Sequence, residues 1–324
     1  MMNWLRIICF ALGLCFLWGC EPGENVEQRV LEAKNRNDAP PIWVVKDVDS
    51  TLYLFGTVHL LPADLSWQKE DMRDVFRSAG TVFFEIDTRP AAQLEASIVL
   101  SERGFYTDGQ LLSERLDDYQ LKLLTAATNN GALSFDRVDS MKPWLASEFL
   151  ILGAAASAGL DPDVSADAAL KSMAQTQRKN ILYLDSAENQ MRRSDTQADF
   201  VQMNVLNDTL TRFNDIGDTL DQTIKAWVSG DVQTLEREII ASMQIRSPDM
   251  YAALFSDPNQ EWGLQLTRFM EGSGTGFAAI GVGHLLGEDS LQNYLKEQGY
   301  TVHRYFAFQG ENVIRPIFET PSGG

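Results

Sequence analysis

Two of the three histidines in the chain occur in segments of the same design, far apart in the sequence. YLFGTVHLL contains Gly56 and His59, and AAIGVGHLL contains Gly281 and His284. Each segment has three residues of strand character, then a glycine, two further residues, a histidine and two leucines. Reactive groups of open α/β sheets gather where strands end, and a glycine there lets the backbone turn or a ligand come close. We therefore expect both histidines at one rim of a sheet. His303, in YTVHRYF, lacks this frame and is expected to be structural.

A carboxylate, Glu85, is the third member of this set. It follows the apolar residues VFF, so burial at a strand end would raise its pKa unless a cation or a metal keeps it ionised. Two imidazoles and one carboxylate suit a divalent first-row metal with open positions, which could activate water or polarise a carbonyl group. Without a metal, the same side chains could act as a base and as electrostatic partners. The alternative for Glu85 is that it faces water where the strand emerges.

The residues around these motifs predict a sheet that is built from both ends of the chain. The runs IWVVK and TLYLF are rich in strand formers and are joined by DVDS, which is typical of a hairpin. The predicted elements near the two ends are strands over Ile42–Lys46 and Thr51–Phe55, a helix over Ser66–Arg77, strands over Thr81–Ile86 and Gly276–Ile280, a helix over Ser290–Gln298 with Gly299 as its C-cap, and a strand over Tyr300–Phe306.

Between residues 90 and 272 the helical period dominates. Helices are predicted over Ala91–Leu100, Ser113–Ala127, Pro143–Ala158, Ala166–Thr176 and Val232–Met243, with one strand over Asn180–Leu184. The expected fold is α/β, with a central mixed sheet built from the N- and C-terminal parts, flanking helices and a large, mostly helical middle region. The domain is expected to cover residues 41–310, followed by a C-terminal tail at 311–324.

The first 20 residues have the character of a signal peptide. Arg6 is their only charge, an apolar run extends from Ile7 to Trp18, and the small residue Gly19 precedes Cys20. About 12 apolar residues are too few to cross a bilayer, which takes roughly 20. The sequence LWGC resembles the bacterial lipobox, whose cysteine receives a diacylglycerol; ordinary cleavage near Gly19 is the alternative. The polar residues 21–40 are suited to a tether.

These features predict an exported protein on the periplasmic side of the cell envelope, held to the membrane by a lipid on Cys20. Glu21 after this cysteine favours the outer membrane, by resemblance to other lipoproteins. All three cysteines lie in the leader, so the mature domain has no internal disulfide. The formal net charge of -18 should repel nucleic acid, and we expect no nucleic-acid partner.

Taken in order, the motifs resemble the TraB/GumN family, which is related to the Tiki proteases and more distantly to the erythromycin-esterase and ChaN-like folds. The resemblance covers about residues 41–306 and rests on PIWVV, TLYLFGTVHLLP, FFEID, MKPW, AW followed by GD, and FAAIGVGHLLGEDSLQNYLKEQGYTVHR. It implies that His59, Glu85 and His284 are the catalytic residues. The Tiki proteins imply metal-dependent peptide cleavage, whereas the esterase relatives imply hydrolysis without a required metal.

The chain departs from the family pattern at two places. Relatives commonly have Arg-Asn before a helix that contains tryptophan, but this chain has Pro258 and Asn259, so a cation expected near the site is missing. Relatives often have Leu-Glu where this chain has a leucine and Asp185, for which we expect a capping or solvated position. Lys142, Trp144 and Asn259 are candidates for lining the pocket, although a helix start and a core aromatic would explain the first two equally well.

The leading hypothesis is a cell-envelope hydrolase that cleaves a peptide or another small envelope substrate. His59, Glu85 and His284 would be its catalytic residues and, in a metal-dependent peptidase, the ligands of Mn, Co or Zn. Two alternatives stay open at the level of sequence. One is a non-catalytic binding or scaffold protein of the envelope on the same fold, and the other is an esterase-like hydrolase that needs no metal.

Overall fold

The computed structural model of the chain describes residues 39–129, 133–161, 163–306 and 313–316. The predicted signal peptide with Cys20, and the predicted tether up to residue 38, lie outside these ranges. Within the ranges, no helix combines the length and the apolar character needed to cross a membrane. A mixed sheet with a large helical region confirms the predicted α/β fold class.

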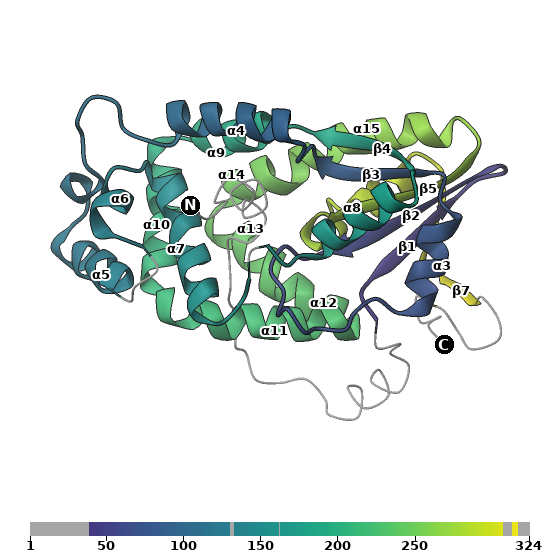
Figure 1. Ribbon diagram of the computed structural model, residues 1–324, viewed down its shortest axis with the longest axis horizontal. Coiled ribbons are helices and arrows are strands. Elements are labelled where there is room, and N and C mark those ends of the chain that lie inside the picture. The colour runs from purple at the N-terminus through teal and green to yellow at the C-terminus, as the bar shows by residue number, and fades with distance from the viewer. Residues whose placement is uncertain (1–38, 130–132, 162, 307–312, 317–324) are drawn as a thin grey trace, which may run out of the picture.

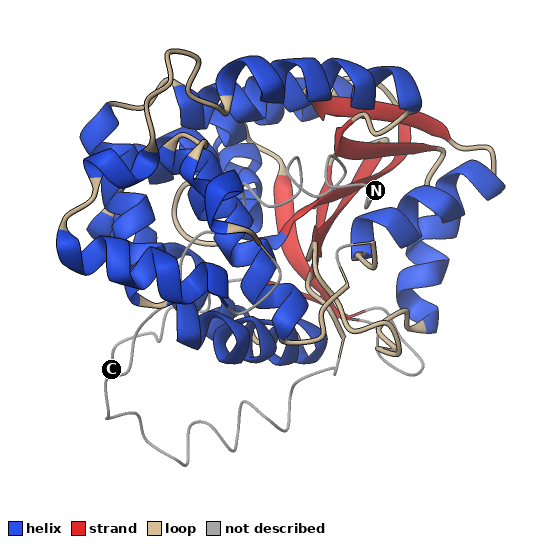
Figure 2. Cartoon of the chain, turned by 60° about the vertical axis from the view of Figure 1, so that its left-hand side comes forward, coloured by secondary structure: helices blue, strands red, loops and turns tan. Residues whose placement is uncertain are grey.

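The sheet contains seven strands in the part of the chain that the structure describes (Figure 2). Four strands are parallel to one another, and the other three extend the sheet in antiparallel fashion. In spatial order they are β4 (Asn180–Asp185), β3 (Thr81–Ile86), β5 (Gly274–Gly281), β2 (Ser50–Thr57), β1 (Ile42–Lys46), β6 (Thr301–Phe306) and β7 (Val313–Pro316). Through β7 the sheet continues past residue 310, where the sequence predicts the domain to end.

A turn that begins at Asp47 joins β1 to β2. The Asp47 carboxylate accepts hydrogen bonds from the backbone N–H groups of Asp49 and Ser50, at 3.1 and 2.7 Å. An aspartate that caps its own turn in this way is a common means of reversing the chain. The strand β2 also pairs with β5. The segment YLFGTVHLL, which contains Gly56 and His59, therefore begins in the middle of the sheet.

The strand β5 is buried on both faces. Its run Phe277–Ile280 is fully buried, and its side chains alternate between two apolar clusters because successive residues of a strand point to opposite faces. Phe277 contacts Phe55 and Phe76, at ring-centroid distances of 5.7 and 5.0 Å. A continuous apolar run of this kind is typical of a parallel strand that helices cover on both sides.

Helices cover the sheet and form the middle of the chain. They are α3 (Glu70–Ser78), α4 (Pro90–Arg103), α5 (Asp118–Asn129), α6 (Phe135–Asp139), α7 (Pro143–Ser157), α8 (Ala166–Thr176), α9 (Ala187–Asp195), α10 (Asp199–Thr211), α11 (Ile216–Ser229), α12 (Val232–Leu235), α13 (Ser242–Arg246), α14 (Pro248–Tyr251), α15 (Asp257–Met270) and α16 (Leu291–Glu297). One face of the sheet packs against α3 and α8, and the other packs against α15 and α16.

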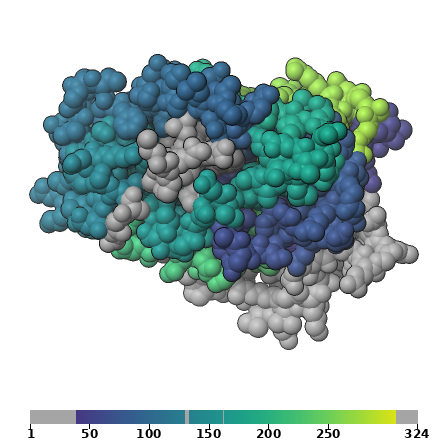
Figure 3. All heavy atoms as spheres, in the orientation of Figure 1, coloured from purple at the N-terminus to yellow at the C-terminus, as the bar shows by residue number. Residues whose placement is uncertain are grey.

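The sheet lies at one end of the molecule and the helices α4 to α7, with α10, lie at the other (Figure 1). In the space-filling view, α3 and α8 cover the face of the sheet that is turned to the viewer (Figure 3). The helix α7 is buried along nearly its whole length and packs against α10 and α11. The helical end is therefore organised around α7 and meets the sheet where the parallel strands finish.

Some predicted helix boundaries are wrong. The helix predicted from Ser66 begins instead at Glu70, because Trp67 packs its ring against Phe55 and Trp227, at centroid distances of 5.8 and 5.4 Å, and the chain there is not helical. The helix predicted over Val232–Met243 is interrupted by a π-helical turn at Glu236–Ala241, and a second π-helical turn covers Ala252–Ser256. Both turns border the candidate site.

Candidate active site

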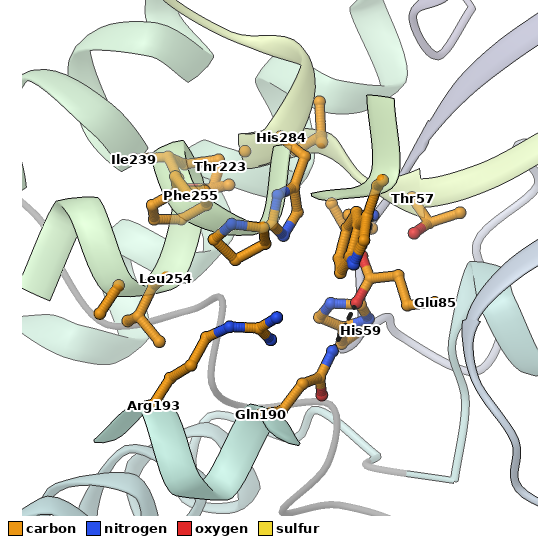
Figure 4. Close-up of a pocket in the computed structure, with 17 residues that line it drawn as sticks. Thr57, His59, Glu85, Gln190, Arg193, Thr223, Ile239, Leu254, Phe255 and His284 are labelled. Carbon is orange, nitrogen blue, oxygen red and sulfur yellow. Dashed lines mark hydrogen bonds between the residues drawn. The ribbon is translucent and has the colours of Figure 1, made fainter. Parts of the chain in front are cut away.

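The carboxyl ends of β2, β3 and β5 lie at one edge of the sheet, because the three strands are parallel neighbours. A cavity of about 50 Å³ lies at this edge, and the side chains of His59, Glu85 and His284 line it together (Figure 4). His59 follows β2, Glu85 lies near the end of β3, and His284 belongs to a short 3-10 helix after β5. The structure thus brings the three predicted residues to one rim of the sheet.

The two frame glycines provide space rather than an unusual backbone conformation. A Cβ atom on Gly281 would lie 3.0 Å from Glu85 Oε1 and 3.3 Å from His59 Nε2, so a side chain there would displace the site. A Cβ atom on Gly56 would lie 2.8 Å from the side chain of Val282. The Gly56 carbonyl also accepts a hydrogen bond of 2.7 Å from the Trp227 indole N–H. Both glycines therefore let the ends of β2 and β5 pack closely.

His59 is held by Asp167, the second residue of α8. The Nδ1 atom of His59 lies 3.0 Å from Asp167 Oδ2, and the Thr57 hydroxyl donates a 2.8 Å hydrogen bond to Asp167 Oδ1. Burial alone would lower the pKa of His59, but the charge and hydrogen bond of Asp167, together with the charge of Glu85, raise it above its ordinary value. Asp167 thus fixes the ring with Nδ1 protonated and favours the imidazolium form.

His284 is held by an amide instead of a carboxylate. Asn259 donates through Nδ2 to the backbone carbonyls of His284 and Asp289, at 3.2 and 2.8 Å, so its Oδ1 accepts from His284 Nδ1 at 2.8 Å. The ring of Trp262 lies 4.4 Å from the His284 ring between centroids. Burial, followed by the charges of His59 and Arg193, lowers the pKa of His284 to about 3. With Nδ1 protonated, the neutral ring leaves a lone pair on Nε2.

Both oxygens of Glu85 have hydrogen-bond donors. The Gly281 backbone N–H donates to Oε1 at 2.6 Å, and the Gln190 side chain donates to Oε2 at 3.3 Å. Burial raises the pKa of Glu85, and neighbouring Asp167 adds to this effect, whereas His59 and the two hydrogen bonds oppose it. Glu85 is therefore a buried, positioned carboxyl group, and the alternative that it faces water is wrong.

The pKa values of the two histidines are shifted in opposite directions although both rings are buried. Pairs of titratable groups whose environments separate their pKa values are a common arrangement for acid and base catalysis. Here the carboxylate of Asp167 favours the acid form of one ring, and the neutral amide of Asn259 leaves the other ring in its base form. Chemically, the cavity can offer a proton acceptor on one side and a proton donor on the other.

Arg193 of α9 is a residue of the cavity wall that the sequence did not indicate. Its side chain is 14% exposed and binds Asp185 and Glu261. The Asp185 side chain is 2% exposed, so the expectation that it faces water is wrong, but its Oδ1 accepts a hydrogen bond from the backbone N–H of Ser186, just before α9, at 2.7 Å. Pro258 also lines the cavity, where an arginine was expected by resemblance. The cation of the site therefore comes from α9 instead of from α15.

Lys142 and Trp144 are not among the described residues that line the cavity. Lys142 precedes α7 and binds Asp195 at 2.7 Å, and Trp144 is 2% exposed in the apolar core. Asn259 does not line the cavity either, but it orients His284 from behind. His303 lies on β6, paired with Val44 of β1 and separated from the site by β1 and β2, as its structural interpretation requires.

The two π-helical turns form much of the apolar wall. Ile239 lies in the first turn, and Ala253, Leu254 and Phe255 lie in the second, and all four line the cavity. Phe255 also packs against His284, at 5.1 Å between ring centroids. π-helical turns interrupt a regular helix and occur frequently at functional sites. The sequence predicts an unbroken helix over Val232–Met243, where the first turn lies, and made no prediction for the second turn.

Among the described residues, no group of three or more His, Cys, Asp or Glu side chains is arranged to hold a metal ion. Both Glu85 oxygens accept protein hydrogen bonds, and the raised pKa of His59 favours a protonated ring, which is not a ligand. Of the predicted ligand set, the Nε2 atom of His284 has the required lone pair. Metal binding by His59, Glu85 and His284 therefore stays a prediction.

Comparison with known proteins shows the family to which the chain belongs. The model of the TraB/PrgY/gumN family matches residues 41–304. The chain is 23% identical over 257 residues to an uncharacterised Escherichia coli K12 protein, YbaP, covering 79% of this chain and 92% of the relative. It is also 23% identical over 244 residues to the uncharacterised YbaP of Shigella flexneri, covering 75% of this chain and 87% of the relative. No solved structure matches the chain significantly.

Proposed function

Because the chain belongs to the TraB/PrgY/gumN family, we propose that it is a hydrolase of the cell envelope that cleaves a peptide or another small substrate at the cavity beside His59, Glu85 and His284. One observation carries this proposal, namely the contrast between two buried histidines at one cavity. His284 has a lowered pKa and an unprotonated Nε2, whereas Asp167 raises the pKa of His59. The pair therefore has the properties of a general base and a general acid.

In the proposed reaction, His284 Nε2 removes a proton from a water molecule, whose oxygen forms a bond to the carbonyl carbon of the substrate. The bond from this carbon to the leaving nitrogen or oxygen then breaks, and His59 Nε2 donates its proton to the leaving group. A proton passes from His284 to His59 through solvent before the next turnover. Asp167 stabilises the protonated form of His59 at the start of each cycle.

Glu85 acts in this scheme as a positioning group. It accepts from the Gly281 N–H at 2.6 Å, so it ties the end of β3 to the end of β5, and its charge is one of the causes that raise the pKa of His59. Buried polar groups are stable when each has a partner, and the hydrogen bonds from Gly281 and Gln190 meet this need. Loss of Glu85 should therefore affect both the geometry and the protonation of His59.

The proposal is tested on the purified mature chain with a peptide library and a panel of nitrophenyl esters, first after chelation and then with Mn, Co or Zn. We expect turnover that falls by about 10²- to 10⁴-fold in His284→Ala and in His59→Ala. His303→Ala is the control and should retain native activity. The dependence of turnover on each added ion tests the metal-dependent form of the hypothesis separately.

The non-catalytic alternative makes a different prediction. A folded protein that shows no turnover of any peptide or ester, with or without the three metals, would favour a binding or scaffold role for the same cavity. Turnover that survives both histidine substitutions would contradict the assignment of the residues. The proposed site of action, the periplasmic side of the envelope, rests on the predicted signal peptide and on lipidation at Cys20.

A further inference from the structure

The cavity contains a fixed cation in addition to its histidines. Of the described residues that line it, Arg193 is the only lysine or arginine. The residue lies three positions after Gln190 on α9, so the two side chains emerge from the same face of the helix. In the close-up, the guanidinium of Arg193 points into the space between His284 and Gln190 (Figure 4). A cation has therefore been placed beside the reacting groups of the proposed site.

Two carboxylates hold the guanidinium without exhausting its donors. Asp185 at the end of β4 binds Nη1, and Glu261 of α15 binds Nη2 at 2.7 Å. An arginine carries five N–H groups in a planar fork, so these two bonds leave donors for a ligand. Asp185 is almost fully buried, whereas Glu261 is 61% exposed and is the weaker anchor. The guanidinium is thus oriented by a buried partner on one edge.

We propose that Arg193 binds a carboxylate of the substrate, so that the cavity selects molecules with a free carboxylate close to the bond that is cleaved. This inference rests on the proposed function and names its substrate class. A guanidinium and a carboxylate form charge-assisted hydrogen bonds in matching geometry, which a neutral amide cannot reproduce. The apolar wall of Ile239, Leu254 and Phe255 reduces the access of water to this pair.

The size and charge of the cavity agree with a small anionic group. About 50 Å³ holds only a few water-sized groups, which suits a carboxylate and its nearest atoms. His284 is neutral because its pKa is lowered to about 3, so it does not repel a cation or an anion by charge. Among the described side chains that line the cavity, Arg193 therefore supplies the permanent positive charge and the free N–H donors that an incoming anionic group can meet.

The experiment measures binding, so it does not depend on turnover. The mature protein is titrated with N-acetylglycine and with its neutral counterpart N-acetylglycinamide, and binding is followed by ligand-detected NMR. We expect N-acetylglycine to bind about tenfold more tightly than the amide, and Arg193→Met to abolish this preference with little effect on the amide. Acetyl-aspartate amide, tested in parallel, distinguishes a side-chain carboxylate from a terminal one.

Arg192→Met is the matched control, because Arg192 is the exposed neighbour on the same helix and bonds only weakly to Asn189, at 3.4 Å. Arg193→Lys keeps the charge but loses the fork, and should keep part of the preference. Equal loss of both ligands in Arg193→Met would identify a structural role and overturn the inference, as would absence of a preference in the native protein. His284→Ala should retain the preference, so failure of the catalytic proposal is recognised separately.

Discussion

Replacing His284 by glutamine should change how the stability of the protein depends on pH. The fold holds this imidazole uncharged, with a pKa of about 3 against an ordinary value of 6.5. The unfolded chain binds a proton there below pH 6.5, whereas the folded chain does not until the pH approaches 3. Because of the lowered pKa, the free energy of unfolding decreases as the pH falls below 6.5. Above pH 6.5 neither state is protonated at this ring, so this decrease is absent.

The size of the effect is set by these two values. At pH 5 the unfolded imidazole is about 1.5 pH units below its own pKa, and each unit corresponds to about 1.4 kcal/mol, so the loss relative to pH 7.5 is about 2 kcal/mol. His59 has the opposite sign, because its raised pKa stabilises the fold at acid pH and this contribution disappears as the pH rises through the folded value. The two histidines can thus be distinguished by the direction of their effects.

Urea unfolding at pH 7.5 and at pH 5 measures the difference. His284→Gln will be less stable than the native protein at pH 7.5, because a buried, hydrogen-bonded ring is lost, but the gap should narrow by about 2 kcal/mol at pH 5. His303→Gln, which removes one imidazole outside the cavity, is the matched control. If the native protein and His284→Gln lost the same stability on acidification, His284 would not be held neutral and its role as a base would fail.

The parallel neighbours β2 and β5 explain why the sequence predicted the positions of the histidines. Each frame ends an apolar strand, and in the observed register Gly56 pairs with Ile280 and Thr57 with Gly281. Two parallel strands that pair in this way place the loops after them at the same edge. The apolar strand, the glycine and the repeated Gly-x-x-His spacing are local signals in the sequence. They are sufficient to predict that both histidines lie at one rim of the sheet, but they do not predict which histidine acts as acid and which as base.

The partners of the histidines could not be predicted, because they come from helices that only the tertiary fold brings to the rim. Asp167 lies in the first turn of α8, where an acidic residue is favourable for any helix. Arg193 lies in the last turn of α9, beside Arg192, where basic residues are equally ordinary. Nothing in residue type or spacing separates these two side chains from helix-end charges that contact only water.

Two further perturbations test the network around the site, and a third tests the predicted lipid anchor. Asp167→Asn should lower the pKa of His59 and should reduce activity by about 10²-fold or more. The alkaline limb of the plot of kcat against pH should then move to lower pH. Asp163→Asn is the control, because Asp163 is exposed and lies just before α8. Cys20→Ser should release the processed protein from the membrane fraction, and equal retention in that fraction would contradict a lipid anchor. Gly281→Ala should reduce activity by about 10²-fold, because the new methyl group would lie 3.0 Å from Glu85 Oε1 and 3.3 Å from His59 Nε2, and small displacements of reacting groups are costly. Gly80→Ala is its control, since the atom nearest to its new methyl group would be the Thr275 carbonyl oxygen at 4.0 Å. Both variants add the same methyl group beside the same sheet, so equal activity in the two would mean that close packing at Gly281 does not set the geometry of Glu85 and His59.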